Sequence, residues 1–326
     1  MHWPNRQWET ARNVKQSVLH DRVKAAGACF GESAGWERPN WYARPGQKAE
    51  YEYNFERQNW FDINAAEHRA VREAVGVFEQ SSFGKILVQG RDAEKVLNHI
   101  ATADMAVPVG RVVYTHFLNK RGGVEADITI SRLADDKFLI LTPAFTCTHI
   151  KAWLHDHTPA DACCVVTDMS SAWAMLNVQG PRARHLLSSI STAKFDNEAF
   201  PYATWQNVEI GFQTALCMRL SYTGEVGFEL YIPTEMALPV YDQLIAAGAD
   251  FGLAHCGYHT LNTLRVEKAF REWAHDMGPV DSLLDAGLGF TCAWHKPGGF
   301  IGRDALLAQR DAGPLKRRLV QFLLDD

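Results

Sequence analysis

Alternation of apolar and polar residues predicts strands in the middle of the chain. A pair of strands joined by a glycine turn is predicted for 'VVYTHFLNKRGGVEADITISRL', and further short strands for 'GKILVQG' and 'DDKFLILTP'. In 'GGVEADITI' one face of the strand carries Val124, Ala126, Ile128 and Ile130. Asp127 falls on the opposite, polar face, although aspartate is unfavourable in the middle of a strand.

Helical spacing of apolar residues alternates with these strands. It is found in 'AAEHRAVREAVGVF', 'RDAEKVLNHIA', 'EMALPVYDQLIAAGADFG' and 'YHTLNTLRVEKAF', and in the stripe of Ile150, Trp153 and Leu154. A hairpin is predicted with strands 'CMRLSY' and 'GFELYIP' around Thr223-Gly224. The final apolar run, 'LVQFLL', is predicted to be a strand whose partner lies outside this chain.

One segment of the chain is echoed 90 residues later. The stretch 'ILVQGRDAEKVLNHI' begins at Ile86 and 'LNVQGPRARHLLSSI' begins at Leu176, and six of their fifteen positions are identical. Each copy is predicted to be a strand, a glycine turn and a helix. The echo indicates either a duplicated α+β subdomain, in which antiparallel strands carry helices on one side, or two ordinary units of this kind.

The opening segment differs in composition from the rest. Residues 1–60 hold five of the ten tryptophans, Trp3, Trp8, Trp36, Trp41 and Trp60. Within it, 'ERPNWYARPG' has two prolines and a glycine that are expected to interrupt any regular element. The segment is therefore predicted to lie across another surface, with its aromatic rings as anchors.

Composition and charge narrow the class of protein. Hydrophobic residues make up 47% and charged residues 22% of the 326, as in ordinary globular proteins. The formal net charge of −5 argues against nucleic-acid binding by bulk electrostatics. No apolar run approaches the roughly 20 residues that span a bilayer, so no membrane partner is expected. Seven scattered cysteines without a CxxC motif fit reduced thiols in a reducing compartment.

Three charged residues stand out as candidates for chemistry. They are Asp127, Glu229 in 'SYTGEVGFELY' and Arg265 in 'TLRVEKAF'. For each, a solvent-facing side chain is the alternative interpretation. His255 and His259 are four residues apart but lack an HExxH motif, so no metal site is predicted.

Taken together, several motifs resemble the aminomethyltransferase (T-protein) family of the glycine cleavage system. The stretches that carry the resemblance are 'VVYTHFLNKRGGVEADITISRL', 'LNVQGPRARHLL', 'RLSYTGEVGFELYIP', 'LNTLRVEKAFREWAHDMGPVDSLLDAGLGF' and 'FIGRDAL'. The closest resemblance is to the tetrahydrofolate-binding part of dimethylglycine and sarcosine dehydrogenases. The opening 41 residues look like the segment that joins the flavin part of those enzymes to the folate part.

The resemblance implies an α+β fold of two related antiparallel subdomains and a set of site residues. Asp127 matches the catalytic carboxylate near N10 of folate. Tyr114 and Tyr222 match residues that line the folate pocket, Glu229 matches the glutamate that bonds the pterin ring, and Arg265 matches an arginine near the folate and substrate end. A carboxylate at N10 can accept the proton that is lost when the carbon unit closes a ring between N5 and N10.

The same resemblance implies a partner and a domain order. Residues 1–60 are predicted to be a connector, 61–310 the tetrahydrofolate-binding domain and 311–326 the start of a C-terminal β-barrel. FAD is expected only in a separate domain or subunit, an amine dehydrogenase that supplies the carbon unit, because this chain has no GxGxxG motif. A bacterial cytoplasm or a mitochondrial matrix is the expected location. The alternatives are a stand-alone glycine-cleavage aminomethyltransferase and a non-catalytic folate-binding protein of the same fold.

Overall fold

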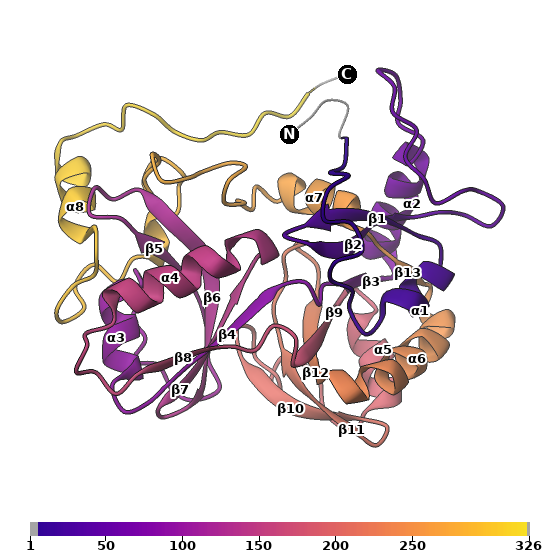
Figure 1. Cartoon of the computed structure of the whole chain (residues 1–326), viewed down its shortest axis with the longest axis horizontal. Helices are drawn as coiled ribbons and strands as arrows, with labels where there is room; N and C mark the ends of the chain where they lie inside the picture. Colours follow the sequence, from indigo (N-terminus) through magenta and orange to yellow (C-terminus); the bar gives the residue numbers. More distant parts are fainter. Residues whose placement is uncertain (1–5, 325–326) are drawn as a thin grey trace. The chain divides into compact units, whose positions relative to one another are not determined.

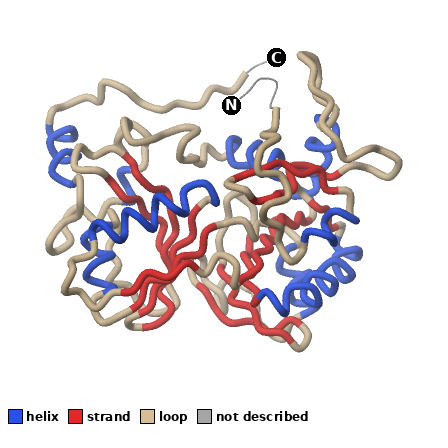
Figure 2. Tube along the Cα trace, in the orientation of Figure 1, coloured by secondary structure: helices blue, strands red, loops and turns tan. Residues whose placement is uncertain are grey.

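The computed structural model describes residues 6–324, so Trp3 of the opening segment lies outside the described residues (Figures 1 and 2). Contacts between residues divide the chain into two units. The first unit comprises the chain up to Phe83 together with Met169–Lys268. The second comprises Gly84–Asp168 together with the chain from Ala269 onward. Each unit is therefore assembled from two segments that are far apart in the sequence.

A six-stranded sheet forms the centre of the first unit. Its strands, in spatial order, are β10 (Trp205–Ile210), β11 (Gln213–Met218), β12 (Gly227–Pro233), β9 (Trp173–Gln179), β3 (Val75–Glu79) and β13 (Leu253–His255). Neighbours are antiparallel except β13, which is parallel to β3. The unit also contains α1 (His20–Ala25), the two-stranded sheet of β1 (Ala28–Ser33) and β2 (Trp36–Tyr42), α2 (Phe61–Glu73), α5 (Ala183–Ile190), α6 (Ala237–Gly248) and α7 (Tyr258–Glu267).

Helix α5 shows why this sheet is covered. Ala183, Leu186, Leu187 and Ile190 recur at the spacing of one helix face, and all four are buried. They join a core that also contains residues of β9, β12 and α6. Burying each such leucine contributes roughly 1.5–3 kcal/mol, so the face fixes the helix on the sheet.

The second unit is built on a five-stranded antiparallel sheet. Its strands, in spatial order, are β5 (Val112–Leu118), β6 (Val124–Ala134), β7 (Lys137–Thr142), β4 (Gly84–Gln89) and β8 (Val165–Asp168). Helices α3 (Ala93–Ile100) and α4 (Cys147–His157) share one core with this sheet. A second core joins the ends of β5 and β6 to the segment that holds a 3₁₀ turn, Gly289–Thr291, and α8 (Arg303–Asp311).

The sequence echo corresponds to two copies of one structural unit. In the second unit β4 leads through Gly90 into α3, and in the first unit β9 leads through Gly180 into α5. The two glycines have φ values of 132° and 136°, which disfavour any residue with a side chain. A Cβ on either would also meet a backbone carbonyl, of Cys163 or of Ala74. The duplicated strand-turn-helix prediction is confirmed.

Three local predictions are wrong. The predicted helix over 'AAEHRAVREAVGVF' ends at Glu73, and the apolar residues that follow form the buried strand β3. The predicted strand 'CMRLSY' ends at Met218, and residues 219–226 form a loop. Pro39 does not interrupt a regular element as predicted, because it lies within β2 of a two-stranded sheet, beside a register shift, whereas Pro45 and Gly46 lie in a turn after that strand. A strand with a free edge tolerates the missing N–H group of proline.

The last described residues have no regular structure. Helix α8 ends at Asp311, and the run 'LVQFLL' from Leu319 to Leu324 contains no strand. The backbone of Leu319 donates a hydrogen bond to Asp285 at 2.8 Å, whereas Phe322 and Leu323 are largely exposed. That this stretch begins a barrel stays a prediction.

Candidate functional site

Asp127 lies on the face of β6 that the sequence predicted. Its neighbours Ala126 and Ile128 are buried in the core, so the carboxyl group points to the other side of the sheet. That side is not open solvent, because only 12% of the Asp127 side chain is exposed. The alternative of a freely solvated carboxylate is therefore wrong.

His116 faces Asp127 across the β5–β6 ladder. The two residues are directly paired in the register, and Nε2 of His116 lies 3.4 Å from Oδ1 of Asp127. The same Nε2 lies 3.3 Å from the hydroxyl of Tyr114, and the two rings meet edge to face. On its other side, Nδ1 of His116 lies 3.0 Å from Oγ1 of Thr291. The structure thus brings Tyr114 and Asp127 together through a fully buried histidine.

Buried polar groups fix the backbone behind His116. Its N–H donates to Oγ1 of Thr102 at 3.2 Å. Lys296 donates from Nζ to the carbonyls of Ala101 and Ala103, at 2.5 and 2.7 Å. Burial lowers the pKa of Lys296 to about 8. The segment on either side of Thr102 is therefore held from two directions.

Glu229 lies on β12 of the first unit, the strand that pairs with β9. Phe228 and Leu230 are fully buried, as predicted, and Glu229 on the opposite face keeps partial access to solvent. The hydroxyl of Tyr231 donates to Oε2 of Glu229 at 2.5 Å. Burial raises the pKa of Glu229 to about 7, although this hydrogen bond favours the ionised form.

A chain of buried amides lies beside Glu229. Asn177 is its register partner on β9, and Asn177 Nδ2 donates to Gln80 at 3.0 Å. Gln179 donates to Asn177 and accepts a hydrogen bond from Thr223 at 3.0 Å. These residues were missed from the sequence, where Gln179 stood out only as part of the echo.

Arg265 and Tyr222 lie elsewhere in the same unit. Arg265 is only 3% exposed, which contradicts the alternative of a surface arginine, and its Nε donates to Asn262 at 2.8 Å. Tyr222 packs against the apolar cluster that contains Phe78 and Leu264. Leu264, which directly precedes Arg265 in α7, thus helps to hold the loop that carries Tyr222.

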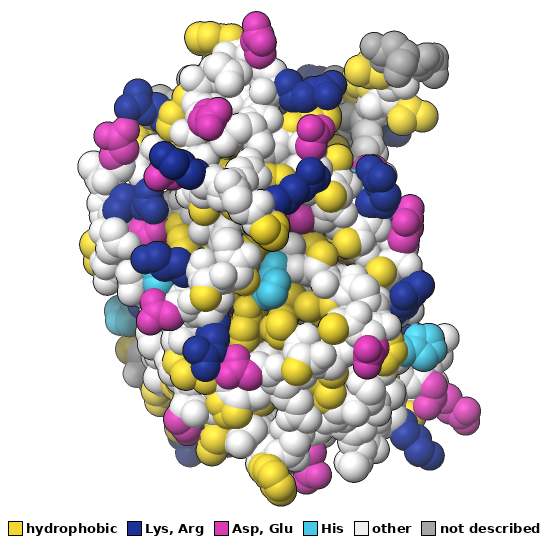
Figure 3. Space-filling model, turned by 90° about the vertical axis from the view of Figure 1, so that its right-hand side faces the viewer, with side chains coloured by type: hydrophobic (Ala, Val, Ile, Leu, Met, Phe, Trp, Pro, Cys, Tyr) yellow, Lys and Arg dark blue, Asp and Glu magenta, His cyan; other side chains and the backbone are white. Residues whose placement is uncertain are grey.

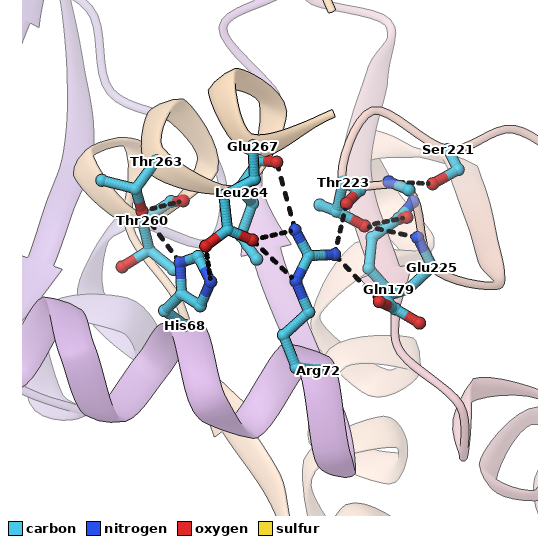
Figure 4. A network of polar contacts seen from close by, with 11 residues as sticks. His68, Arg72, Gln179, Ser221, Thr223, Glu225, Thr260, Thr263, Leu264 and Glu267 are labelled. Atoms are coloured by element: carbon cyan, nitrogen blue, oxygen red, sulfur yellow. Dashed lines mark hydrogen bonds and ion pairs between the residues drawn. The ribbon is translucent and has the colours of Figure 1, made fainter. Parts of the chain in front are cut away.

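A charged network fastens this loop to two helices (Figure 4). Arg72 of α2 donates from Nη1 to the carbonyl of Thr223 and to Glu225, at 2.6 and 2.9 Å. Through Nη2 it also binds Glu267 of α7 at 2.8 Å. His68, one turn earlier, lies 3.1 Å from the same Glu267. The 'YTGE' motif therefore has a fixed conformation because one guanidinium group joins it to α2 and α7.

Other candidate chemistry does not assemble. Among residues 6–324 no group of three or more His, Cys, Asp or Glu side chains could hold a metal ion. His255 instead bonds Tyr241 at 2.7 Å, and His259 bonds Tyr51 at 2.9 Å. Burial raises the pKa of the Cys29 and Cys292 thiols to about 12, which leaves them unreactive as nucleophiles. No helix in the described part of the chain has the length and apolar character that crossing a bilayer requires.

Two of the predicted site residues, Asp127 and Glu229, are carboxylates that can accept further hydrogen bonds. Within the described residues, Oδ2 of Asp127 and Oε1 of Glu229 take part in no hydrogen bond or ion pair. Acidic and basic side chains are interspersed on the face drawn in Figure 3, in keeping with the small net charge. Each carboxylate, within its own unit, offers hydrogen-bond acceptance that suits a ligand group carrying N–H donors.

Comparison with known proteins identifies a family. Residues 19–296 match the model described as GCVT N-terminal domain. The whole chain is 47% identical to 4-methylaminobutanoate oxidase (formaldehyde-forming) of Paenarthrobacter nicotinovorans and covers 39% of that protein. It is 36% identical, over 99% of its length, to the mitochondrial sarcosine dehydrogenase of Homo sapiens, of which it also covers 39%. The chain therefore spans about two fifths of the length of these relatives.

A solved structure extends the comparison to the fold. The glycine cleavage system aminomethyltransferase T from Bartonella henselae is 25% identical to this chain and has a TM-score of 0.77. The match covers 93% of this chain and 76% of that one. The predicted α+β fold and the resemblance to this family are confirmed.

Proposed function

The chain belongs to the GCVT N-terminal domain family, and on that premise we propose that it is a tetrahydrofolate-dependent one-carbon transfer module. It would accept the carbon unit that an amine oxidase or dehydrogenase releases from an N-methyl amine, and form 5,10-methylenetetrahydrofolate. Two of its relatives, a 4-methylaminobutanoate oxidase and a sarcosine dehydrogenase, support N-methyl amino acids as the source of that carbon.

The observation that carries the proposal is the placement of Asp127. Its carboxylate is nearly buried, has one oxygen without a partner among the described residues, and is held opposite His116 on a rigid ladder. Closing the ring between N5 and N10 of the folate requires a base at N10 and an anion near the developing cation. A pre-positioned carboxylate supplies both.

Glu229 is assigned to recognition of the pterin ring. The edge of a reduced pterin presents several N–H donors, and a carboxylate pairs with them through charge-assisted hydrogen bonds. Asn177 and Gln179 extend this polar surface along β9. Tyr114, which is 37% exposed, and Tyr222 are assigned to contacts with the folate, and Arg265 to its anionic end.

The carbon unit is proposed to come from a flavin-dependent partner. Oxidation of an N-methyl amine gives an iminium ion that releases formaldehyde in water, and capture by tetrahydrofolate prevents that loss. The sequence carries no GxGxxG motif of a dinucleotide-binding fold, so FAD is assigned to a partner domain or subunit.

The Asp127→Asn variant tests the assignment. Asparagine keeps the shape of the side chain but cannot take up the proton, so we expect tetrahydrofolate affinity within about tenfold of the wild type and loss of methylene transfer. Affinity is measured by calorimetry. Transfer is measured as 5,10-methylenetetrahydrofolate formed from tetrahydrofolate and formaldehyde, after subtraction of the uncatalysed rate.

A matched control is Asp136→Asn. Asp136 lies in the exposed turn between β6 and β7 of the same sheet, and the variant should behave as the wild type. Equal transfer by Asp127→Asn and the wild type would contradict the assignment of Asp127. Tight binding of folate without any transfer by the wild type would favour a non-catalytic folate-binding protein.

A stand-alone aminomethyltransferase is a second candidate, because the Bartonella henselae enzyme covers nearly the whole chain. The two candidates differ in the donor. An aminomethyltransferase releases ammonia as it transfers carbon from an aminomethyl group, whereas the proposed module accepts carbon at the level of formaldehyde. Ammonia release from an aminomethylated carrier protein, without any need for an amine oxidase, would favour the second candidate.

A further inference from the structure

His116 has the features of a group that acts through Asp127 rather than on the substrate. Its side chain is completely buried, yet both ring nitrogens are directed at polar partners. Burying an imidazole costs free energy unless both nitrogens find partners, and Thr291 and Tyr114 supply them here. Resting on the proposed function, we infer that His116 is a positioning residue that receives the proton taken up by Asp127 and so keeps this carboxylate charged.

Thr291 determines which ring nitrogen carries the hydrogen. The hydroxyl of Thr291 donates to the carbonyl of Leu288 at 2.8 Å. Its oxygen is then left to accept a hydrogen bond from Nδ1 of His116, at 3.0 Å. The neutral ring therefore has its hydrogen on Nδ1, and Nε2 presents a lone pair.

That lone pair is directed at the two residues assigned to the reaction. Tyr114 donates its hydroxyl hydrogen to Nε2 in the resting protein, at 3.3 Å. Oδ1 of Asp127 lies 3.4 Å from Nε2, so no hydrogen joins these two acceptors while the ring carries its hydrogen on Nδ1. A proton placed between Nε2 and Oδ1 converts this contact into a charge-assisted hydrogen bond.

The proton can be followed through the proposed step. As N10 bonds to the carbon unit, its N–H bond breaks, the electron pair stays on N10, and the proton goes to Oδ2 of Asp127. Rotation of the carboxyl group about χ2, a soft torsion, brings this hydrogen toward Nε2. Transfer to His116 leaves an imidazolium ion beside a carboxylate, so the negative charge near the substrate is restored. Tyr114, which is 37% exposed, links the ring to solvent.

Nitrogen-15 NMR of the wild-type chain, with labelled histidine, tests the geometry directly. The signals of His116 are identified by their loss in His116→Gln. We expect a neutral ring protonated at Nδ1, and a ring protonated at Nε2 alone would overturn the inference without any reference to activity. Thr291→Val, which removes the acceptor for Nδ1–H, should release this tautomer preference.

Kinetics test the role. In His116→Gln we expect tetrahydrofolate affinity within twofold of the wild type and a methylene transfer rate at least tenfold lower. The fall should appear in the maximal transfer rate and not in the Michaelis constant for tetrahydrofolate, because His116 acts after the folate is bound, whereas a purely structural change would alter both. The exposed His155→Gln is the matched control and should change neither.

The outcomes separate this inference from the proposed function. If Asp127→Asn abolishes transfer while His116→Gln leaves the maximal transfer rate unchanged, the inference is wrong and the function stands. If Asp127→Asn has no effect, the proposed function fails first. If His116→Gln does not fold, Thr291→Val provides the same kinetic test, with an expected fall in rate at unchanged affinity.

Discussion

Glu229 is a carboxyl group whose charge can change when a ligand binds. Burial raises its pKa from an ordinary value of 4.5 to about 7, so near neutral pH about half of the molecules carry the protonated form. A donor-rich pterin requires the ionised form. Binding should therefore expel a proton at pH values below about 7.

We expect the dissociation constant of tetrahydrofolate to rise by up to about tenfold for each pH unit below 7 and to be constant above pH 8. The dissociation constant rises as pH falls because Glu229 of the free protein holds a proton that must leave when the complex forms. Calorimetry between pH 6 and 8.5, in two buffers of different ionisation enthalpy, measures both affinity and proton release. Glu229→Ala should lose about 2 kcal/mol of binding free energy or more, and its affinity should no longer depend on pH in this range. Unchanged affinity in the variant would place Glu229 outside the pocket.

For single residues, the sequence predicted which face of a strand a side chain points to better than it predicted how deeply that side chain is buried. Alternation along a strand correctly placed Asp127 and Glu229 on the faces away from the core. The same rule places His116 on a polar face, where nothing in the pattern distinguishes a buried histidine from a solvated one. That distinction depends on Thr291, which is 175 residues away in the sequence. Long-range contacts of this kind cannot be read from local periodicity.

Among elements, α2, α7 and the loop before β12 depend on one side chain. Arg72 supplies hydrogen bonds to Thr223, Glu225 and Glu267, and so joins both helices to the loop, whereas His68 of α2 reaches only Glu267 of these three. The 18% exposure of its side chain places it between a surface and a buried ion pair, so its loss has a clear cost.

We expect Arg72→Met to lower the free energy of unfolding by about 2–3 kcal/mol. Methionine retains most of the alkyl packing but leaves the Thr223 carbonyl and Glu225 without this donor, and leaves Glu267 with His68 alone. Urea denaturation measures the effect. Arg69→Met, three residues earlier on the exposed side of α2, is the control and should cost less than about 0.5 kcal/mol. Equal stabilities of the two variants would show that the network is dispensable.

Element boundaries were predicted where a turn residue marks them. The echo located β4 and β9 because Gly90 and Gly180 each end a strand with a positive φ. The boundary between α2 and β3 was missed because 'AVGVF' continues the apolar spacing of the helix, and only pairing with β9 makes it a strand. Pairing between distant segments overrides local propensity here.

At the scale of the molecule, ionisable groups of opposite tendency are concentrated in the first unit. Burial raises the pKa values of Glu67 and Glu229 to about 7 and lowers those of His255 and His259 to about 4. Glu67 accepts hydrogen bonds from Tyr42, Gly257 and Thr260, which favour its ionised form but do not outweigh burial.

These four groups act in opposite directions on stability. The raised carboxyl groups bind more protons in the folded state between pH 4.5 and 7, so their contribution falls as pH rises through this window. The buried histidines bind fewer protons in the folded state between about pH 4 and 6.5, so their contribution is lost as pH falls. The free energy of unfolding should therefore vary little between pH 4.5 and 6.5, since each carboxyl offsets one histidine.

Replacing one of the two buried histidines should make the free energy of unfolding depend on pH in this window. In His255→Gln the amide oxygen can still accept the hydrogen bond from Tyr241, but no proton binds on unfolding. Relative to the wild type, the variant should gain stability as pH falls from 6.5 to 4.5, by on the order of 1 kcal/mol per pH unit. Urea denaturation at pH 4.5, 5.5, 6.5 and 7.5 measures the difference. His155→Gln, at a site where the side chain is 90% exposed, should run parallel to the wild type. A His255→Gln curve that also ran parallel would mean that His255 is protonated in the folded chain, and hence that its hydrogen bond to Tyr241 is made by the imidazolium form.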